Sequence, residues 1–298
     1  MQLRAGDFLK PRSWINFGLT GVLWGVPYLL IRVAVAPGQF TPAFVVFARV
    51  AIGAALLLPY AHRRGTLKPA LKGFKWIALY GVIEMAGPWG FVSQSETKLN
   101  SGLAALLIAT VAIWATLLNG ALGDKSVWHS TRILGLIVGF FGISLVVGIE
   151  SLQGKVDTFA IFLILLAAIG YAIAPTMVRA KIPDLDGAAV NGLAMLTTAI
   201  IYLPFALAQW PHHHVRPNSI YSVIALGIFP TAVCFVIFFK VLADIGSARA
   251  SLVAYVNTGV AVLLGVIVLQ EKLTTGILLG LPLVLIGSYY ASRKPITR

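Results

Sequence analysis

Apolar residues in this chain gather in long runs that short turns separate. Ten runs approach the roughly 20 apolar residues that a membrane-spanning helix needs, at residues 14–35, 41–61, 74–93, 100–121, 132–149, 158–178, 187–208, 219–240, 247–269 and 274–292. The turns carry breakers such as Pro37-Gly38 and the stretch from Pro211 to Asn218. Because no polar stretch is long enough to fold alone, the pattern predicts an all-α integral membrane protein with ten transmembrane helices.

The pattern also repeats within the chain. The segment from Asn100 to Ser144 returns as the segment from Gly246 to Tyr290. Each copy has an early serine, an acid-lysine pair after an apolar run, and two equally spaced glycines in the next run: Ser101, Asp124-Lys125, Gly135 and Gly142, then Ser247, Glu271-Lys272, Gly280 and Gly287. An internal repeat of this length indicates that the protein consists of two related halves.

Extended upstream, the repeat pairs Trp24 with Tyr171 and Arg32 with Arg179, which gives five spans to each half. An odd number of spans makes the second half enter the membrane from the opposite face. We therefore predict two domains, residues 14–149 and 158–292, that form inverted five-helix repeats around a central cavity. Such symmetry favours two conformations, each open to one side, with a site near the midplane.

Composition agrees with a membrane protein. Of the 298 residues, 58% are hydrophobic and 11% are charged, which is more apolar than a soluble core can bury. The net charge of +13 does not indicate nucleic-acid binding, because no folded basic domain carries it. Cys234 is the one cysteine, so a disulfide or a cysteine metal site is excluded. The run His212-His213-His214 is interpreted as solvated loop, because no other metal ligands accompany it.

The positions of lysine and arginine predict the orientation. With the N-terminus on the inner side, the inner loops collect most of these residues, including the group at Arg63, Arg64, Lys68 and Lys72. The outer side keeps Arg32, Lys98, Lys155, Arg216 and Lys272. Positive charge is retained on the cytoplasmic side, so we expect both termini in the cytoplasm of a cell whose inner membrane holds the protein.

The order of these features resembles the drug/metabolite transporter superfamily, in particular proteins built from two EamA-type halves and the YddG-like branch of amino-acid exporters. The resemblance rests on Trp24-Gly25 followed by Arg32, on the helix from Arg49 to Pro59, and on the repeated segments ending in Asp124-Lys125 and Glu271-Lys272. It implies a cavity lined by the first, third and fourth spans and their counterparts. It also places the fifth and tenth spans outside, packed through the glycines Gly135, Gly139, Gly142, Gly276, Gly280 and Gly287.

Two charged residues fall within predicted spans, Arg49 and Glu84. At about 1.5 Å of rise per residue, their depths nearly coincide, so we expect them to pair across neighbouring helices. The repeat places Ala194 and Pro230 opposite them, so both charges are absent together in the second half. Two roles stay open: Glu84 as a protonatable coupling group or a ligand for a substrate ammonium, and the pair as a structural pin between two helices.

Aromatic and polar residues at mid-span are the candidates for substrate binding. Deep aromatic rings are not explained by the interfacial belt, and they can hold an ammonium by cation–π attraction. Packing alone explains some of them. The candidate substrate-binding residues are Trp24, Tyr28, Glu84, Trp89, Trp114, Tyr171, Phe235, Tyr255 and Asn257.

Two further pairs are candidates for moving parts. Pro27 and Pro175 occupy nearly equivalent places in the repeat, where they act either as hinges or as static kinks. Lys98 and Asp244 lie in repeat-equivalent loops on opposite faces and are candidate gates, although solvation at the interface is the ordinary explanation of charged residues at loop ends.

These features predict a secondary exporter of aromatic and other amino acids and related small metabolites. It would work as a monomer in lipid, by alternating access, without a cofactor or catalytic residues. A nucleotide-sugar or sugar-phosphate carrier, a channel or receptor of this fold, and an intramembrane enzyme are the alternatives. No acid lies between Trp14 and Val35, where small relatives of the superfamily carry a coupling glutamate, so coupling through Glu84 and facilitated diffusion both stay open.

Overall fold

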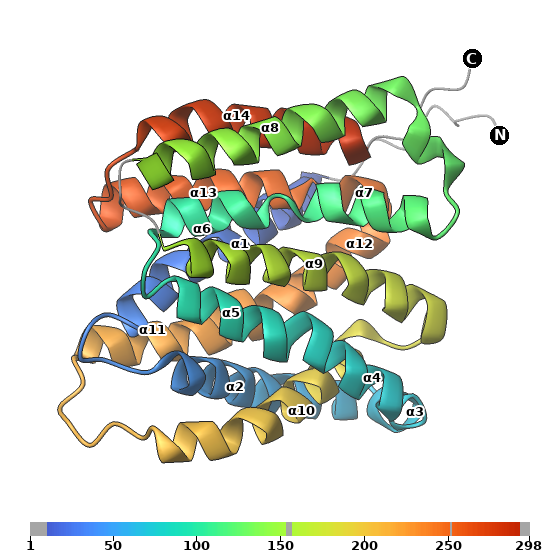
Figure 1. The fold of residues 1–298 in the computed structure, drawn as a ribbon. Coiled ribbons are helices and arrows are strands. Elements are labelled where there is room, and N and C mark those ends of the chain that lie inside the picture. The colour runs from blue at the N-terminus through green and yellow to red at the C-terminus, as the bar shows by residue number, and fades with distance from the viewer. Residues whose placement is uncertain (1–10, 153–156, 251, 293–298) are drawn as a thin grey trace.

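The computed structural model describes residues 11–152, 157–250 and 252–292, and within these residues the protein is helical without strands. Figure 1 shows the helices lying roughly side by side in one bundle. They are α1 (Pro11–Ala34), α2 (Pro42–Arg63), α3 (Leu67–Leu71), α4 (Phe74–Tyr80), η1 (Gly81–Ala86), α5 (Gly87–Ser95), α6 (Ser101–Ile108), α7 (Val111–Ala121), η2 (Lys125–Trp128), α8 (Ser130–Leu152), α9 (Thr158–Lys181), α10 (Gly187–Ala208), α11 (Pro217–Gly227), η3 (Ile228–Val233), α12 (Cys234–Ala250), α13 (Val253–Val268) and α14 (Thr275–Ser292).

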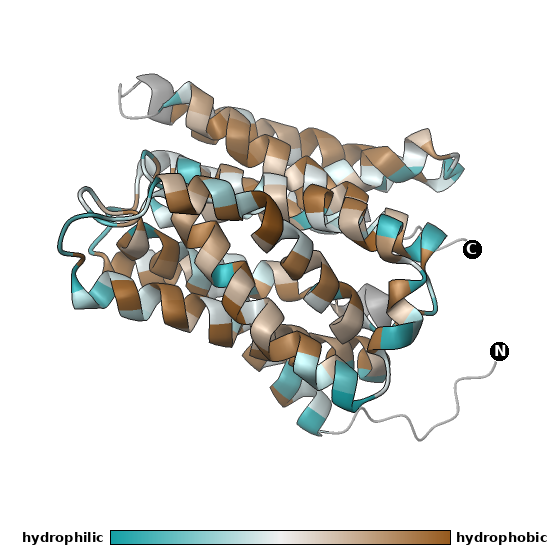
Figure 2. Ribbon diagram, turned by 90° about the horizontal axis from the view of Figure 1, so that it is seen from below, coloured by the Kyte–Doolittle hydropathy of each residue, from teal (hydrophilic) through white to brown (hydrophobic). Residues whose placement is uncertain are grey.

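Six helical segments of the described chain are long and apolar enough to cross a membrane: Pro11–Ala34, Pro42–Arg63, Ser101–Ala121, Thr158–Lys181, Gly187–Ala208 and Pro217–Ile245. Three shorter apolar helices accompany them: Ser130–Val146, Val253–Val268 and Thr275–Ala291. Figure 2 shows hydrophobic residues along the helices and hydrophilic residues gathered toward the ends of the bundle. The all-helical membrane fold predicted from the apolar runs is confirmed, and the count of ten spans stays a prediction.

The two ends of the bundle are named here by the segments found there. α1 begins and α14 ends at one end of the bundle, which we call the terminal end (Figure 1). The loops of residues 35–41 and 209–216 lie at the opposite, distal end (Figure 1). These two loops are joined, because the side-chain oxygen of Gln39 accepts a hydrogen bond of 2.8 Å from the backbone N–H of Arg216.

Helices from the two halves of the chain pack in pairs that repeat. α1 packs against α13, and α9 packs against α6 and α7. α5 packs against α9, and α1 packs against α11 and α12. α2 packs against α10, and α8 against α14. Exchanging the first half of the chain for the second maps this set of pairs onto itself, which is the arrangement that a twofold relation between the halves would produce.

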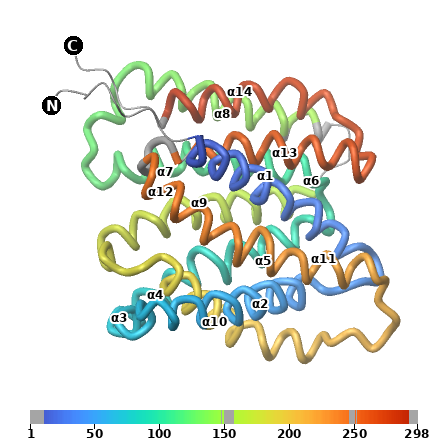
Figure 3. The backbone as a smooth tube through the Cα atoms, turned by 180° about the vertical axis from the view of Figure 1, so that it is seen from behind, coloured from blue at the N-terminus to red at the C-terminus, as the bar shows by residue number. Residues whose placement is uncertain are grey.

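The α8–α14 pair lies along one edge of the bundle, as the views from the front and from behind agree (Figures 1 and 3). Gly287 of α14 lies so close to α8 that an added Cβ would meet the backbone of Gly139 and Gly135, and a Cβ added at Gly135 would meet the backbone of α14. An added Cβ at Gly142 would lie 2.9 Å from the Cβ of Leu283. Small residues let membrane helices approach in this way, and the glycine contacts predicted between these helices are confirmed at these positions.

Two long segments contain π-helical turns at equivalent places. η1 continues directly from α4 into α5, and η3 continues directly from α11 into α12. Pro88 follows the first turn and Pro230 lies in the second, and each removes a backbone donor from the helix. π-Turns are rare in proteins and frequently lie at functional sites.

Candidate functional site: a cavity open toward the terminal end

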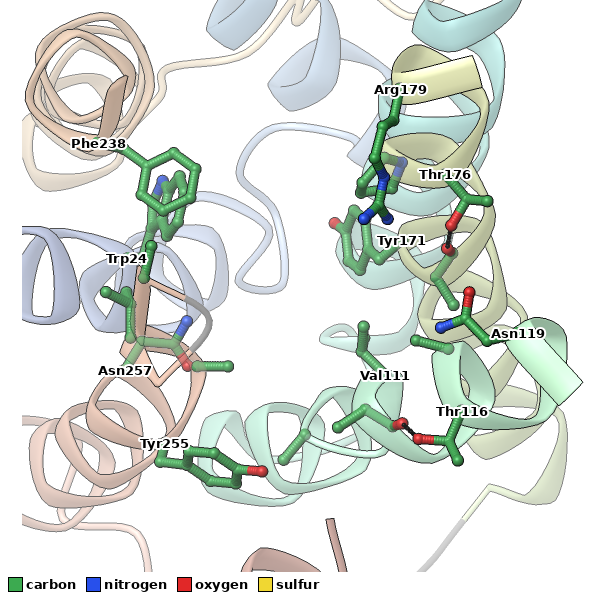
Figure 4. A pocket seen from close by; sticks show the side chains of 18 of the residues that line it. Trp24, Val111, Thr116, Asn119, Tyr171, Thr176, Arg179, Phe238, Tyr255 and Asn257 are labelled. Carbon is green, nitrogen blue, oxygen red and sulfur yellow. Dashed lines mark hydrogen bonds between the residues drawn. The ribbon is translucent and has the colours of Figure 1, made fainter. Parts of the chain in front are cut away.

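A cavity of about 360 Å³ lies between α1, α7, α9, α12 and α13. Four aromatic side chains line it: Trp24, Tyr171, Phe238 and Tyr255. Figure 4 shows Trp24 and Phe238 on one wall and Tyr171 and Arg179 on the facing wall. Its volume and apolar walls with a few polar groups are typical of a small-molecule site.

The helix faces that border the cavity follow from sequence spacing. Residues four apart lie on one face of a helix, so Tyr171, Pro175 and Arg179 share one side of α9, and all three line the cavity. Asn119 lies near the end of α7, and Arg179 near the end of α9. The cavity therefore extends from the middle of the bundle, at Trp24, to its terminal end.

Four of the predicted substrate-binding residues line this cavity: Trp24, Tyr171, Tyr255 and Asn257. The structure places the other five outside it. Tyr28 and Trp89 are buried in helix packing. Phe235 lies behind Trp24, with ring centroids 5.7 Å apart in an edge-to-face contact. Trp114 lies outside the lining, because its ring packs edge-to-face on Phe140 of α8.

The fifth residue outside the cavity is Glu84, and its predicted ion pair with Arg49 is not formed. The Nε of Arg49 donates to the hydroxyl of Thr231, 2.8 Å away, and its guanidinium carbon lies 3.6 Å from the ring centroid of Trp89. The Oε2 atom of Glu84 is buried without a hydrogen-bond partner. The depth argument assumed a regular α-helix, whereas Glu84 lies in the π-turn η1, which changes the direction in which its side chain points.

Sequence reasoning missed several polar residues of the cavity. The polar residues that line it without having been predicted are Thr116, Asn119, Arg132, Thr176 and Arg179. Arg179 carried a usable signal, because it lies on the face of α9 that Tyr171 and Pro175 define and it is the repeat partner of Arg32. Asn119 and the threonines carried none, since single polar residues near helix ends are ordinary.

The distal end is closed by a carboxylate that caps a helix. The carboxylate of Glu271 accepts hydrogen bonds from the backbone N–H of Ser101, at 2.9 Å, and from its hydroxyl, at 2.7 Å. A third bond, 3.3 Å long, comes from the N–H of Gly102. These donors are unsatisfied at the start of α6, where the helix dipole favours negative charge. Every residue of α6 from Ser101 to Leu107 is buried, so this end of the bundle offers no entrance along α6.

One more contact between helices lies at the distal end. The guanidinium of Arg32 donates to the backbone carbonyl of Glu96. The carboxyl of Glu96 is buried, neither of its oxygens has a hydrogen-bond partner, and burial raises its pKa well above the ordinary value.

Gln270 precedes Glu271 with a positive φ of 55°, an uncommon conformation for a residue other than glycine. Its repeat partner Gly123 has a φ of 100°, so both acids follow a left-handed turn.

Among the described residues, the corresponding acid at the terminal end bonds to neighbours in its own half of the chain. Asp124 accepts from the guanidinium of Arg132, 3.3 Å away, and from the backbone N–H of Ser126, 3.0 Å away. The bonds from Ser126 and then Arg132 hold the pKa of Asp124 below its ordinary value. The candidate gate residue Asp244 accepts from the hydroxyl of Ser13, at 2.9 Å, while the other candidate, Lys98, is exposed.

The hinge candidates Pro27 and Pro175 lie inside the continuous helices α1 and α9, and their role stays a prediction. Within the described residues, no group of three or more histidine, cysteine, aspartate or glutamate side chains could hold a metal ion. The aromatic walls of the cavity and its closed distal end fit the binding and release of a solute through one end.

Comparisons with known proteins point the same way. The family model described as "EamA-like transporter family" matches residues 12–148 and again 158–293. The chain is 25% identical over 285 residues to "Uncharacterized inner membrane transporter YedA" of Escherichia coli, covering 92% of this chain and 91% of the relative. It is 24% identical over 280 residues to "Uncharacterized transporter YoaV" of Bacillus subtilis, covering 90% and 92% of the two chains.

One relative has a name that includes a substrate. The chain is 24% identical over 282 residues to "Probable terminal-alkyne amino-acid exporter" of Streptantibioticus cattleyicolor, covering 94% of this chain and 93% of the relative. A solved structure titled "Crystal structure of protein" superimposes with a TM-score of 0.64 at 17% identity, covering 92% and 94% of the two chains. That similarity shows the fold alone.

Proposed function

The chain belongs to the EamA-like transporter family, and from this premise we propose that it is a secondary transporter that exports amino acids, aromatic ones included, and related small metabolites. The cavity that carries this proposal reaches one end of the bundle, while Glu271 caps α6 at the other. A cavity with access from one end is what an alternating-access carrier presents in one of its two states.

The proposed mechanism uses ten helices as two inverted five-helix repeats. The repeating helix pairs and the equivalent π-turns support this arrangement. The distribution of lysine and arginine assigns the terminal end to the cytoplasm. In that orientation the cavity faces the cytoplasm, which is the side from which an exporter of an inner membrane loads its substrate.

The composition of the cavity supports an amino-acid substrate. Its aromatic rings offer apolar surface and cation–π contacts, and Arg179 offers a guanidinium. A nucleotide-sugar or sugar-phosphate carrier would need several free cations for phosphate, whereas Arg132 is already engaged by Asp124 and Ser126. An enzyme would need an acid–base pair at the site, and the described cavity residues include no acid.

Counterflow in proteoliposomes tests the proposal. Purified protein is reconstituted with unlabelled amino acid inside, and uptake of the labelled amino acid is followed across a panel, with and without a pH gradient. We expect saturable counterflow. We also expect Trp24→Ala to slow it roughly tenfold through lost stacking surface. Trp128→Ala is the matched control, because Trp128 is 68% exposed and does not line the cavity.

Two outcomes would contradict the proposal. Uptake that never saturates would indicate a channel. Counterflow of nucleotide sugars or sugar phosphates without counterflow of any amino acid would favour the alternative carrier. A dependence on the pH gradient would separate proton coupling from facilitated diffusion.

A further inference from the structure

The charge of the cavity is one-sided. Arg132 and Arg179 are the charged side chains among the described residues that line it, and no aspartate or glutamate joins them. Arg132 is already occupied, because its Nε donates to the carbonyl of Ala291, 2.9 Å away, and its Nη1 donates to Ser126 and Asp124. Arg179 makes no hydrogen bond or ion pair with another described residue. A cationic group with unused donors therefore faces a cavity that holds no counter-charge.

The guanidinium of Arg179 points into the cavity. Arginines near the ends of membrane helices commonly extend outward to the interface. Figure 4 instead shows Arg179 turned back along α9 toward Tyr171, on the wall that faces Trp24 and Phe238. A ligand held between these walls would meet the guanidinium at one end and aromatic rings along its length.

Few other donors are free for an anion. The hydroxyl of Thr116 donates to the carbonyl of Ala112, 2.8 Å away, and that of Thr176 donates to the carbonyl of Ala172. The amides of Asn119 and Asn257, the indole N–H of Trp24 and the hydroxyl of Tyr171 remain, and all four groups are neutral. Arg179 is thus the strongest donor for an anion here, and its planar fork of N–H groups matches a carboxylate.

The repeat partner of Arg179 shows how an arginine at this position is used. Arg32 donates to the backbone carbonyl of Glu96 at the closed distal end. At the open terminal end, the part of the chain that the structure describes offers the equivalent guanidinium no such oxygen acceptor. The two arginines therefore differ in their hydrogen bonding: Arg32 is bonded at the closed end, and Arg179 keeps its donors for a ligand at the open end.

We propose that the guanidinium of Arg179 binds the carboxylate of the transported solute, so that the cavity selects aromatic or apolar carboxylates and does not require their ammonium group. This inference rests on the proposed transport function and deepens it by naming the chemical group that is selected. The absence of an acid from the described lining means that an ammonium would find aromatic faces and amides but no carboxylate to pair with.

Calorimetric titration of the protein in lipid nanodiscs tests this with three ligands that share a phenyl ring. These are L-phenylalanine, 3-phenylpropionate, which lacks the ammonium, and phenethylamine, which lacks the carboxylate. We expect the two carboxylates to bind and phenethylamine to bind at least about tenfold more weakly, since a hydrogen bond to a charged group is worth roughly this much or more.

Arg179→Gln should weaken binding of both carboxylates about tenfold or more and leave phenethylamine unchanged. Lys181→Gln is the matched control, because it removes one positive charge from the same end of α9, while Lys181 lies 5.0 Å from the ring of Trp76 and does not line the cavity. Tryptophan fluorescence and gel filtration check that each variant is folded, and Arg179→Lys provides a second folded variant with the charge kept and the fork lost.

The outcomes separate this inference from the proposed function. If the wild type binds phenethylamine as well as phenylalanine, or if Arg179→Gln and Arg179→Lys keep full affinity for 3-phenylpropionate, the inference is wrong and the transport function stands. If the wild type binds none of the three ligands, both the carboxylate selection and the aromatic amino-acid substrate are wrong.

Discussion

The two parts of one predicted span, α6 and α7, differ strongly in burial, although their sequences are similarly apolar. α6 lies toward the distal end and is buried from Ser101 to Leu107, whereas α7 lies toward the terminal end, where Ile113 and Thr116 are its buried residues. Both segments are strongly apolar. The difference arises from their surroundings, because Glu271 caps the start of α6 and the cavity borders α7.

The same contrast separates residues that the repeat makes equivalent. Arg32 and Glu271 are engaged in contacts between helices at the distal end. Their partners Arg179 and Asp124 lie at the terminal end, where the first is unpaired among the described residues and the second binds residues close to it in sequence. Equivalent residues in unequal contacts are what one conformation of a two-state carrier would contain. In a carrier of that kind, exchanging the contacts would give the other conformation.

The largest effect is expected from Glu271→Gln, which removes the charge that holds three donors of Ser101 and Gly102. Hydrogen bonds to a charged group contribute about 1.5–3 kcal/mol, so we expect the distal end to open about ten- to a hundredfold more often. A cysteine placed at Ala104, which is fully buried, in a Cys234→Ala background reports opening through its rate of labelling by a maleimide in nanodiscs.

Lys272→Gln is the control for this measurement, because Lys272 is the exposed neighbour of Glu271 and makes no contact with Ser101. Labelling of Ala104→Cys that stays unchanged in the Glu271→Gln variant would show that Glu271 does not hold the distal end closed. The contrast between the two ends would then need another cause.

A smaller effect is expected from Arg32→Gln, which removes the guanidinium that donates to the carbonyl of Glu96. One hydrogen bond with one charged partner is lost, so we expect labelling at the same reporter to rise about tenfold, the low end of the range for Glu271→Gln. Binding of 3-phenylpropionate should be retained, in contrast to Arg179→Gln, because Arg32 does not line the cavity. Arg216→Gln, at an exposed distal arginine, should change neither quantity, and equal labelling in Arg32→Gln and Arg216→Gln would argue against a role in closure.

Much of the fold could be predicted from the sequence, because the length and hydropathy of an apolar run are enough to identify a membrane helix. The glycine-mediated packing of α8 and α14 was also predictable, because glycines such as Gly135 and Gly287 have no side chain and let two helix backbones approach closely. The π-turns η1 and η3 were not, because the prolines beside them fit a kink equally well. Glu84 lies in η1, and its predicted ion pair with Arg49 is not formed.

Some of the residues that line the cavity could be predicted from the sequence, and others could not. Trp24 and Tyr171 were found because aromatic rings at mid-span need an explanation and the repeat pairs them. Arg179 was missed as a cavity residue, because a cation at a helix end is ordinarily explained by orientation in the membrane. The capping of α6 by Glu271 was missed, because the partners of Glu271 on α6 include backbone N–H groups, and no sequence pattern reveals such contacts.

The smallest effect is expected from Asp124→Asn, the change at the terminal end that corresponds to Glu271→Gln. Asp124 is exposed and pairs with Arg132, which keeps its bonds to Ala291 and Ser126 when the aspartate is neutralised. Exposed ion pairs contribute little, so we expect labelling of the Ala104 reporter to be unchanged and counterflow to stay within about fivefold of the wild type. An increase in labelling as large as that of Glu271→Gln would mean that the two ends are not held differently.

The pH dependence sharpens this last prediction. Hydrogen bonds from Ser126 and Arg132 lower the pKa of Asp124 in the folded protein, so its pair with Arg132 is intact above the ordinary pKa and is lost only as the pH falls through the lowered value. Any small difference in counterflow between the wild type and Asp124→Asn should therefore be the same at about pH 8 and about pH 5, both above the ordinary pKa of aspartate near 3.9. A difference that disappears between these two values would show that the carboxylate takes up a proton in this range, and hence that the contacts described at the terminal end do not hold it in its charged form.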